Sequence, residues 1–331
     1  MALIYWFCSD EQFQPETILE QARVIEQSGF DGLMLSDHFH PWVDDVGASG
    51  FAYSIFGAIA AVTSKVKIMS AVTAPLFRFH PAVIAQAAAT IDRLSGGRFE
   101  LGIGTGENIN EGPLGFMLPA YAERQARLNE AFEIISRLLA GEKLDFTGEF
   151  YQTKAAKLYS PPVHKIPVFL AAGGPKTAAA VANGYDGLMV SVKNPEETLT
   201  KVIEPAKQAV SALGGNQLVN SMKIAAVSWS IYAKTDEEAW QAAKSQRGLR
   251  APGRDEAIDP LQLQQAADQL PREDIISRYN RVASVDDYRQ LYGPLISELH
   301  ADIVGIQTTS INQIDTIKLL GRELLPALRS L

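Results

Sequence analysis

The sequence alternates short apolar runs with longer segments of helical periodicity from one end to the other. The apolar runs do not alternate with polar residues, so they predict strands buried on both faces, as parallel strands are. Eight such runs occur, at residues 3–8, 32–36, 66–72, 99–104, 168–172, 187–190, 224–232 and 303–307. Eight strands with helices between them predict an α/β fold, the (β/α)8 TIM barrel.

An open, doubly wound sheet is the alternative to a barrel. Sheets of that kind that bind dinucleotides carry a glycine-rich phosphate loop directly after the first strand. Here residues 9–12 read Ser-Asp-Glu-Gln and contain no glycine. This difference favours the barrel, and we expect residues 1–331 to form it as a single domain.

The segments between the runs carry helix signals and two interruptions. A helix that ends at Gly96 and Gly97 is expected to bury one face. That face would consist of Val83, Ala87, Ile91 and Leu94. Residues 144–160 predict a hairpin with its turn at Thr147 and Gly148, and residues 249–282 form a polar insertion after the seventh strand.

Composition and charge exclude several classes of protein. The chain has a net charge of −8 and a pI near 5.3, which makes a nucleic-acid partner unexpected. Cys8 is the only cysteine, so a disulfide framework and a thiolate metal cluster are excluded. The N-terminal segment lacks the basic start of a signal peptide, and no apolar run reaches the roughly 18 residues of a membrane span. We therefore expect a cytoplasmic protein without a membrane partner.

In a barrel, the loops after the C-terminal ends of the strands carry the chemistry. The loop after the second strand reads SDHFHPW at residues 36–42. Imidazole titrates near neutral pH and a carboxylate can orient it, so His38 beside Asp37 is a candidate general base. His38 and His40 have the spacing of two zinc ligands, but the remaining histidines do not follow strands, and no metal site is expected.

Two glycine-rich loops follow the fourth and fifth strands. Residues 102–106 read GIGTG and precede Glu107 and Asn110, whose polar groups suit the edge of a flat ligand. Gly173 and Gly174 precede a helical segment, where free backbone N–H groups suit a phosphate. Both loops are candidates for binding a small molecule.

Four charged residues complete the set of candidates. Glu11 follows the first strand and Lys193 the sixth, whereas Arg254 and Arg278 lie in the insertion. An acidic protein must supply local positive charge to hold an anionic substrate. The three basic residues are therefore candidates for substrate binding.

Together these motifs resemble the coenzyme F420-dependent glucose-6-phosphate dehydrogenases, a family within the bacterial luciferase-like superfamily. The matching motifs occur in the family's order: Glu11-Gln12-Phe13, SDHFHPW at 36–42, Phe77-Arg78 followed by PAVIAQ at 81–86, Gly104-Thr105-Gly106-Glu107, and AAGGP at 171–175. The resemblance implies a luciferase-like TIM barrel with the insertion closing its mouth. It also implies a deazaflavin, coenzyme F420, across that mouth and a homodimeric assembly.

The resemblance gives the catalytic candidates their roles. His38, oriented by Asp37, would remove the hydroxyl proton of an alcohol or hemiacetal while the carbon delivers its hydride to the deazaflavin. Trp42 and Glu11 would flank the reacting centre, and Glu11 is the alternative base. Glu107 would lie near the ring nitrogen that gains negative charge.

The resemblance also assigns residues to the cofactor. A cis peptide between Ala71 and Val72 would support the ring, with Asp37, Glu107 and Asn110 as further ring contacts. Gly173 and Gly174 would hold the phosphate-bearing tail.

The expected substrate is a sugar phosphate resembling glucose 6-phosphate, or an alcohol. Lys193 and Arg278 match two phosphate-binding positions of the family, and the resemblance implies Arg254 at the third. Asp255 stands where the family has a histidine, which leaves another sugar phosphate or an uncharged alcohol open. Two alternatives to this function remain: an FMN-dependent luciferase-like monooxygenase and a non-catalytic deazaflavin-binding protein.

Overall fold

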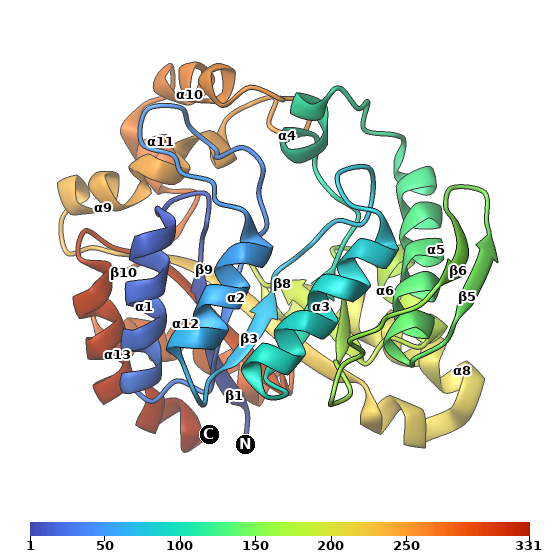
Figure 1. Ribbon diagram of the computed structural model, residues 1–331. Helices are drawn as coiled ribbons and strands as arrows, with labels where there is room; N and C mark the ends of the chain where they lie inside the picture. Colours follow the sequence, from blue (N-terminus) through green and yellow to red (C-terminus); the bar gives the residue numbers. More distant parts are fainter.

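The computed structural model describes residues 1–331, the side chain of Asn216 excepted, and forms the closed barrel that the alternation predicts (Figure 1). The barrel strands are β1 (Leu3–Cys8), β2 (Gly32–Leu35), β3 (Lys67–Ser70), β4 (Phe99–Ile103), β7 (Val168–Ala171), β8 (Gly187–Ser191), β9 (Lys223–Tyr232) and β11 (Ile303–Thr309). Every pairing in the ring is parallel, and the pairing of β8 with β9 closes it. The C-terminal ends of all eight strands therefore meet at one rim.

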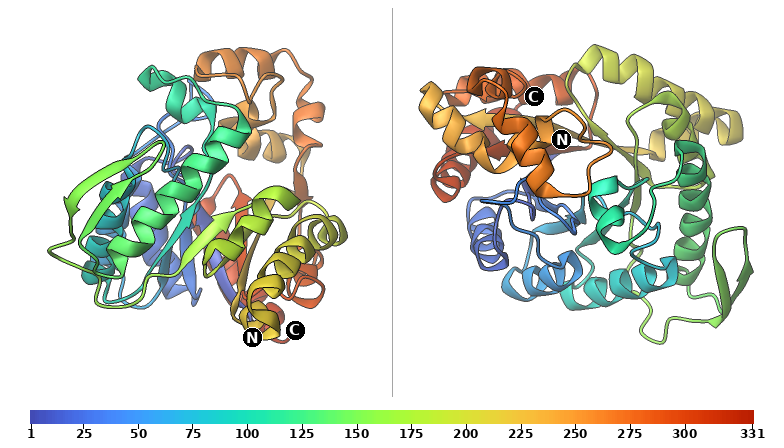
Figure 2. Two further views of the ribbon diagram at one scale, coloured as in Figure 1. Left: turned by 90° about the vertical axis from the view of Figure 1, so that its right-hand side faces the viewer. Right: turned by 90° about the horizontal axis from the view of Figure 1, so that it is seen from above.

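Helices surround the strands as an outer ring, seen from above in Figure 2. The long ones are α1 (Pro15–Gln27), α2 (Ala52–Val62), α3 (Pro81–Ser95), α5 (Tyr121–Leu139), α8 (Glu204–Ser221), α12 (Val285–Ser297) and α13 (Gln313–Arg329); the shorter α4 (Asn108–Glu111), α6 (Pro175–Ala179) and α7 (Pro195–Thr198) lie in loops or complete a crossover. Both chain termini lie at the end of the barrel opposite the insertion (Figure 1). In the part of the chain that the structure describes, no helix is both long and apolar enough to span a membrane.

Burial on both strand faces explains why the apolar runs are continuous. On β1, Ile4 and Trp6 pack toward the helices, whereas Tyr5 and Phe7 point into the barrel. The residues that fill the barrel interior are Tyr5, Phe7, Met34, Met69, Phe169, Met189, Ala225, Val227 and Ile303. The protein therefore has two apolar layers, one inside the barrel and one between the sheet and the helices. Burial of one such side chain stabilises the folded state by roughly 1.5–3 kcal/mol.

The predicted buried face of α3 is wrong at Val83 and Leu94, whereas Ile91 is buried as predicted. Val83 and Leu94 are 52% and 63% exposed, whereas Ile84, Ala88 and Ile91 are buried. The buried stripe of α3 is rotated by about one residue from the predicted stripe. The small alanines of this helix pack closely against the neighbouring helices. The larger Val83 and Leu94 side chains lie outside that contact.

The predicted hairpin at residues 144–160 is present but its turn lies further along the chain. Strands β5 (Leu144–Thr147) and β6 (Gln152–Ala156) pair antiparallel, with Thr147 opposite Gln152. The connection is therefore residues 148–151, and Thr147 belongs to the strand. The hairpin lies outside the barrel beside α5 (Figure 1).

The insertion after β9 covers part of the rim. It follows α9 (Asp236–Ala243) and contains the 3-10 helix η4 (Lys244–Arg250), α10 (Pro260–Asp268), α11 (Arg272–Ile276) and β10 (Asn280–Val282). Although its composition is polar, it has an apolar side that packs with Trp42 and Ile109 from other loops. The Arg247 guanidinium, 2% exposed, pairs with Asp45 and Asp268 at 2.9 and 2.7 Å. These contacts fix the insertion to the loop after β2.

We expect Gly248→Ala to destabilise the protein. A Cβ at Gly248 would lie 1.8 Å from the backbone oxygen of Trp42, so the insertion and the Trp42 loop would have to separate. Such overpacking costs about 1–3 kcal/mol in unfolding free energy, measurable by urea denaturation. Gly57→Ala in α2 is the matched control: its Cβ meets nothing within 4 Å, and Ala favours a helix. Equal stability of the two variants would contradict the contact.

Candidate active site

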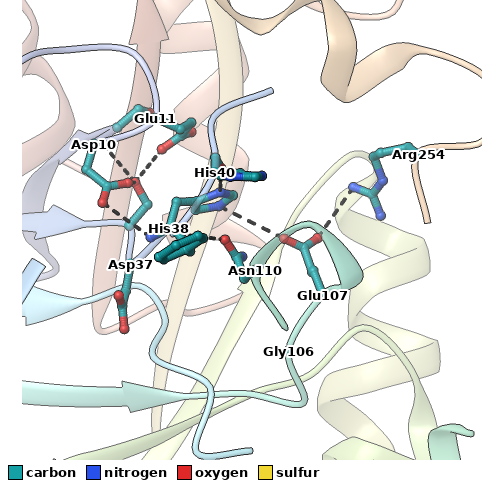
Figure 3. Close-up of polar contacts among 12 residues, drawn as sticks. Asp10, Glu11, Asp37, His38, His40, Gly106, Glu107, Asn110 and Arg254 are labelled. Atoms are coloured by element: carbon teal, nitrogen blue, oxygen red, sulfur yellow. Dashed lines mark hydrogen bonds and ion pairs between the residues drawn. The ribbon is translucent and has the colours of Figure 1, made fainter. Parts of the chain in front are cut away.

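The rim at the C-terminal ends of the strands encloses a cavity of about 600 Å³. Its walls come from the loops after β1, β2, β3, β4 and β7 and from the insertion; Figure 3 shows the polar side chains of the loops after β1, β2 and β4 and Arg254 of the insertion. Most of the predicted site residues line it: Glu11, Asp37, His38, Trp42, Ala71, Val72, Glu107, Asn110, Gly173 and Arg254. The structure thus brings side chains from distant parts of the sequence to one cavity.

The His38 imidazole is held with one nitrogen free. Nδ1 lies 3.1 Å from the backbone oxygen of His40. A carbonyl oxygen can only accept, so the neutral ring carries its proton on Nδ1 and a lone pair on Nε2. Nε2 lies 4.0 Å from Oε2 of Glu107, and the ring packs edge-on against Trp42 with centroids 5.1 Å apart. This geometry suits a general base.

The expectation that Asp37 orients His38 is wrong. The Asp37 carboxyl accepts a hydrogen bond from Thr73 Oγ1 at 2.8 Å and pairs with Arg78 at 2.8 Å. In Figure 3 it points away from the His38 ring. Asp37 and His38 are adjacent in an extended loop, so their side chains point to opposite sides of the backbone. The His38 ring is therefore fixed by the backbone carbonyl of His40 instead. Asp37 still lines the cavity, where its carboxyl belongs to a buried network beneath the rim.

That network reaches Glu111, which no motif in the sequence distinguishes. Arg78 lies between the carboxyls of Asp37 and Glu111, and its backbone N–H donates to Glu111 Oε2 at 3.1 Å. Burial raises the pKa of Glu111 above its ordinary range, although the contacts with Arg78 oppose the shift. Because the Arg78 guanidinium pairs with Asp37 and burial favours the neutral form of Glu111, a protonated Glu111 is consistent with this arrangement. The ion pair of Asp37 with Arg78 is thereby left intact.

Glu11 belongs to a second group of buried acids. Its Oε2 lies 2.5 Å from Ser36 Oγ, which also lies 2.9 Å from Oδ1 of Asp10. Asp10 is fully buried and its Oδ2 accepts the backbone N–H of His38 at 3.2 Å. Burial, then the nearby charges of Glu11 and Asp37, raise the pKa of Asp10 well above its ordinary value. A single serine proton cannot serve two carboxylates, so this group is best satisfied when Asp10 is protonated.

Glu107 joins the loop after β4 to the insertion. One of its oxygens lies 4.0 Å from His38 Nε2 and the other lies 3.7 Å from Nη1 of Arg254 (Figure 3). Its side chain is 41% exposed, so these contacts are solvated and individually weak. Asn110 is buried, and its Oδ1 accepts the backbone N–H of Phe39 at 2.8 Å. Asn110 therefore fixes the loop that carries His38.

A cis peptide joins Ala71 and Val72, as the resemblance implies. The strand predicted through Val72 ends at Ser70, and the chain returns to the ladder where Thr73 bridges to Ile103. Both residues line the cavity. A Cβ on Gly104 would lie 2.8 Å from Cγ2 of Val72, so the backbone of the glycine loop packs directly on this bulge.

Gly173 and Gly174 lie further along the same rim. A Cβ on either would meet nothing within 4 Å, so both leave open space above their backbone. Arg124 of α5 lines the same cavity as Gly173, donates to the Gly106 carbonyl at 3.0 Å, and has a buried Nε without a partner. Arg124 was missed from the sequence, because an arginine in the first turn of a helix is usually solvated. Open backbone and an unpaired guanidinium nitrogen suit a large anionic ligand.

A second cavity of about 800 Å³ adjoins the first beneath the insertion. Trp229, Leu249 and Arg254 line both cavities. The three predicted cations, Lys193, Arg254 and Arg278, all line the second one. Arg250 lines it as well and was missed from the sequence, where nothing distinguishes it from its arginine neighbours.

Among the residues that the structure describes, no group of three histidine, cysteine or acidic side chains is arranged to hold a metal ion. His38 and His40 direct their Nδ1 atoms to different backbone oxygens, those of His40 and Ile258.

Comparison with known proteins identifies the family. The model of the luciferase-like monooxygenases matches residues 4–289. The chain belongs to this family. The F420-dependent glucose-6-phosphate dehydrogenase of Segniliparus rotundus is 33% identical over 329 residues, covering 98% of this chain and 97% of the relative. The protein of the same name from Nakamurella multipartita is 32% identical over 328 residues, with 98% and 95% covered. The resemblance stated from the motifs is confirmed.

Among solved structures, this chain is similar to an F420-dependent secondary alcohol dehydrogenase in complex with an F420-acetone adduct. The two share 27% sequence identity with a TM-score of 0.87, and 99% of each chain is covered. This similarity, together with the observed ring of strands, confirms the luciferase-like (β/α)8 barrel.

We expect the protonation of Asp10 to make stability depend on pH. Its folded-state pKa is raised, so the folded protein retains a proton that the unfolded chain loses, and stability falls as pH rises above the ordinary aspartate value. Asp10→Asn removes that titration while keeping an acceptor for the His38 N–H. Unfolding free energies between about pH 5 and pH 8 should therefore fall less steeply for the variant. Parallel curves for the two proteins would contradict a protonated Asp10.

Proposed function

We propose that this protein is an F420-dependent dehydrogenase that oxidises a CH–OH group. The observation that carries the proposal is the free Nε2 of His38, which lies in one cavity with Ala71, Val72 and the glycine loop after β4. A base in a cavity that is lined on another side by small side chains and glycine backbone suits removal of a hydroxyl proton next to a planar hydride acceptor. The relatives and the solved structure named above are F420-dependent enzymes, two of them named for glucose 6-phosphate and one for a secondary alcohol.

The residues present fit this cofactor. The Ala71–Val72 bulge, Asp37, Glu107 and Asn110 would contact the ring, because all of them line the cavity. Gly173 and Gly174 would hold the phosphate-bearing tail, since their open backbone admits close approach. Arg124 has an unpaired buried nitrogen at the same rim, which favours an anionic tail.

F420, when bound, supplies a ring carbon that accepts the hydride. His38 takes the hydroxyl proton on Nε2 while its Nδ1 proton remains on the His40 carbonyl. Glu107, 4.0 Å from Nε2, stabilises the positive charge that this transfer places on the ring. Trp42 packs against the imidazole and limits its rotation.

Glu11 remains the alternative base. Its carboxyl lines the cavity but is 1% exposed and bonded to Ser36. A carboxylate held in this way keeps its orientation, and it can accept a proton only on its remaining oxygen. The free nitrogen of His38 makes the histidine the better candidate.

The substrate we propose is a sugar phosphate or another alcohol. Lys193, Arg254 and Arg278 line a cavity that shares Trp229 and Arg254 with the one around His38, which suits a substrate with its anionic group away from the reacting carbon. Two further proposals rest on the family resemblance: a homodimer and a cytoplasmic location.

Titration with oxidised F420 and with FMN, followed by fluorescence, tests the cofactor. We expect F420 to bind with a dissociation constant in the micromolar range or tighter, with FMN bound at least about 100-fold more weakly, a difference of roughly 2.7 kcal/mol. A preference for FMN would contradict the proposal and favour a luciferase-like monooxygenase. Binding of F420 without turnover of any alcohol or sugar phosphate would favour a non-catalytic binding protein.

His38→Asn should separate catalysis from binding. Asparagine keeps a polar group in the loop but cannot accept the proton, so turnover should fall by about 10²–10⁴-fold. The dissociation constant for F420 should change little, because the proposed ring contacts come from other residues. Glu11→Gln provides the comparison: a larger loss of turnover in that variant than in His38→Asn would move the base to Glu11.

A further inference from the structure

Gln307 brings a polar side chain to the top of the apolar barrel interior. Alternate side chains of a strand face the same side. On β11, Ile303 belongs to the apolar cluster inside the barrel, and Gln307, further along the same face, lines the cavity around His38. The strand register places Gln307 opposite Trp229 of β9, which lines this cavity as well. Gln307 therefore lies where the apolar interior ends and the cavity begins.

The amide of Gln307 is buried and only half satisfied. The residue is 3% exposed, and its Nε2 lies 3.4 Å from Oγ of Ser9, which directly follows β1. Among the residues that the structure describes, none donates a hydrogen bond to its Oε1. Burial of an amide oxygen without a donor is unfavourable. An unpaired acceptor in the wall of a ligand cavity indicates that the ligand supplies the donor.

Three other residues that line this cavity have a buried polar atom without a hydrogen bond, and each differs from Gln307. Oδ1 of Asp37 lies 2.8 Å from the Arg78 guanidinium and is paired by its charge. The unpaired atoms of Trp42 and Arg124 are N–H donors. Among the described side chains of the cavity, Oε1 of Gln307 is therefore the neutral acceptor that still needs a donor.

The strand that carries Gln307 is fixed from several sides. β11 pairs with β1 on one edge and with β9 on the other. The backbone oxygen of Gln307 also lies 3.4 Å from the hydroxyl oxygens of Ser230 and Tyr292, both of which are buried. A preorganised acceptor loses little conformational entropy when it binds a ligand, so one hydrogen bond here can contribute to specificity.

Gln307 also lies close to the loop that carries the base. Ser9, its hydrogen-bond partner, precedes Asp10, and Oδ2 of Asp10 accepts the backbone N–H of His38 at 3.2 Å. The side chain from β11 and the base from the loop after β2 are thus joined through two adjacent residues of the loop after β1. This short path favours recognition of a group beside the oxidised carbon over recognition of a distant one.

We propose that Gln307 is a specificity-determining residue whose Oε1 accepts a hydrogen bond from a hydroxyl on the carbon next to the one oxidised. The inference rests on the proposed function, which it makes more specific: the substrate is a vicinal diol or polyol. A ligand that fills the cavity excludes water, so a substrate without this hydroxyl leaves the buried acceptor unpaired. Such a site rejects the analogue that lacks the group more strongly than an apolar pocket can.

Ligands that differ by one hydroxyl test this contact. Binding of trans-1,2-cyclohexanediol and of cyclohexanol to the protein without F420 is followed by tryptophan fluorescence, because Trp42 and Trp229 line the cavity. Wild-type protein should bind the diol more tightly by about 5-fold or more, the effect expected when a buried acceptor gains or lacks its donor. Gln307→Met keeps the length of the side chain and removes the acceptor, so it should bind both ligands equally.

Gln21→Met is the matched control. Gln21 has a buried amide with both polar atoms unpaired, but it lies on α1 and is not among the described residues that line either cavity. This variant should keep the wild-type preference for the diol.

The same preference should appear in turnover with F420. The kcat/KM for glucose 6-phosphate should exceed that for 2-deoxyglucose 6-phosphate, or that for the diol should exceed that for cyclohexanol, whichever pair is oxidised. Gln307→Met should remove the difference mainly by lowering kcat/KM for the substrate with the additional hydroxyl.

Each outcome decides the assignment. A preference for the diol that survives in Gln307→Met would overturn it, as would an equal loss of affinity for both ligands, which a purely structural role predicts. Wild-type protein that binds neither ligand, or both equally, would overturn it as well. Because the binding measurement uses no cofactor, failure of the proposed function would appear as absent oxidation with F420, while the binding difference between wild type and Gln307→Met remains.

Discussion

The hydrogen bonds between β8 and β9 close the sheet, and the site depends on that closure. All eight barrel strands are parallel, so closing the ring places every strand's C-terminal end on one circular rim. Loops that start near residues 9 and 310 thereby become neighbours. Glu11 after β1 and Gln307 near the end of β11 line the same cavity as Glu107 and Arg254. An open sheet would separate its two edge strands and disperse these side chains.

The unequal lengths of β8 and β9 determine where the insertion lies. β8 pairs with β9 only as far as Val227, whereas β9 continues to Tyr232. Beyond Val227 the edge of β9 is taken by β10, whose Asn280 lies opposite Ser230. The last strand of the insertion is thus fixed at the rim. Its apolar side then packs on Trp42 and Ile109, which joins the segments after β2 and β4 and gives the mouth a second, adjoining cavity.

Charge is distributed unevenly over the two cavities. Beneath the catalytic one lie Asp10, Glu11, Asp37 and Glu111, with Arg78 the cation among them. Burial favours the neutral form of Asp10 and Glu111, and the remaining ionised groups can then be paired or hydrogen-bonded. The positive charge lies instead under the insertion. This division gives the two adjoining cavities opposite electrostatic character.

The sequence alone determined the fold class and most of the site. Continuous apolar runs identify strands buried on both faces, and polar residues directly after those runs identify the rim, because parallel strands end there. Helix α3 shows the limit: its buried face depends on which neighbours pack against it, and the stripe proposed from the larger side chains is wrong.

Only the tertiary structure decided how the site residues are paired. Their adjacency in the sequence predicted that Asp37 orients His38. In the structure the two side chains face opposite sides of the loop, and the His40 carbonyl orients the His38 ring. Likewise, Arg254 and Arg250 look alike in sequence, and their difference arises from Asp255 and Glu107 on one side and two aromatic rings on the other. Which groups meet across loops is a property of packing in three dimensions, and periodicity along the chain does not encode it.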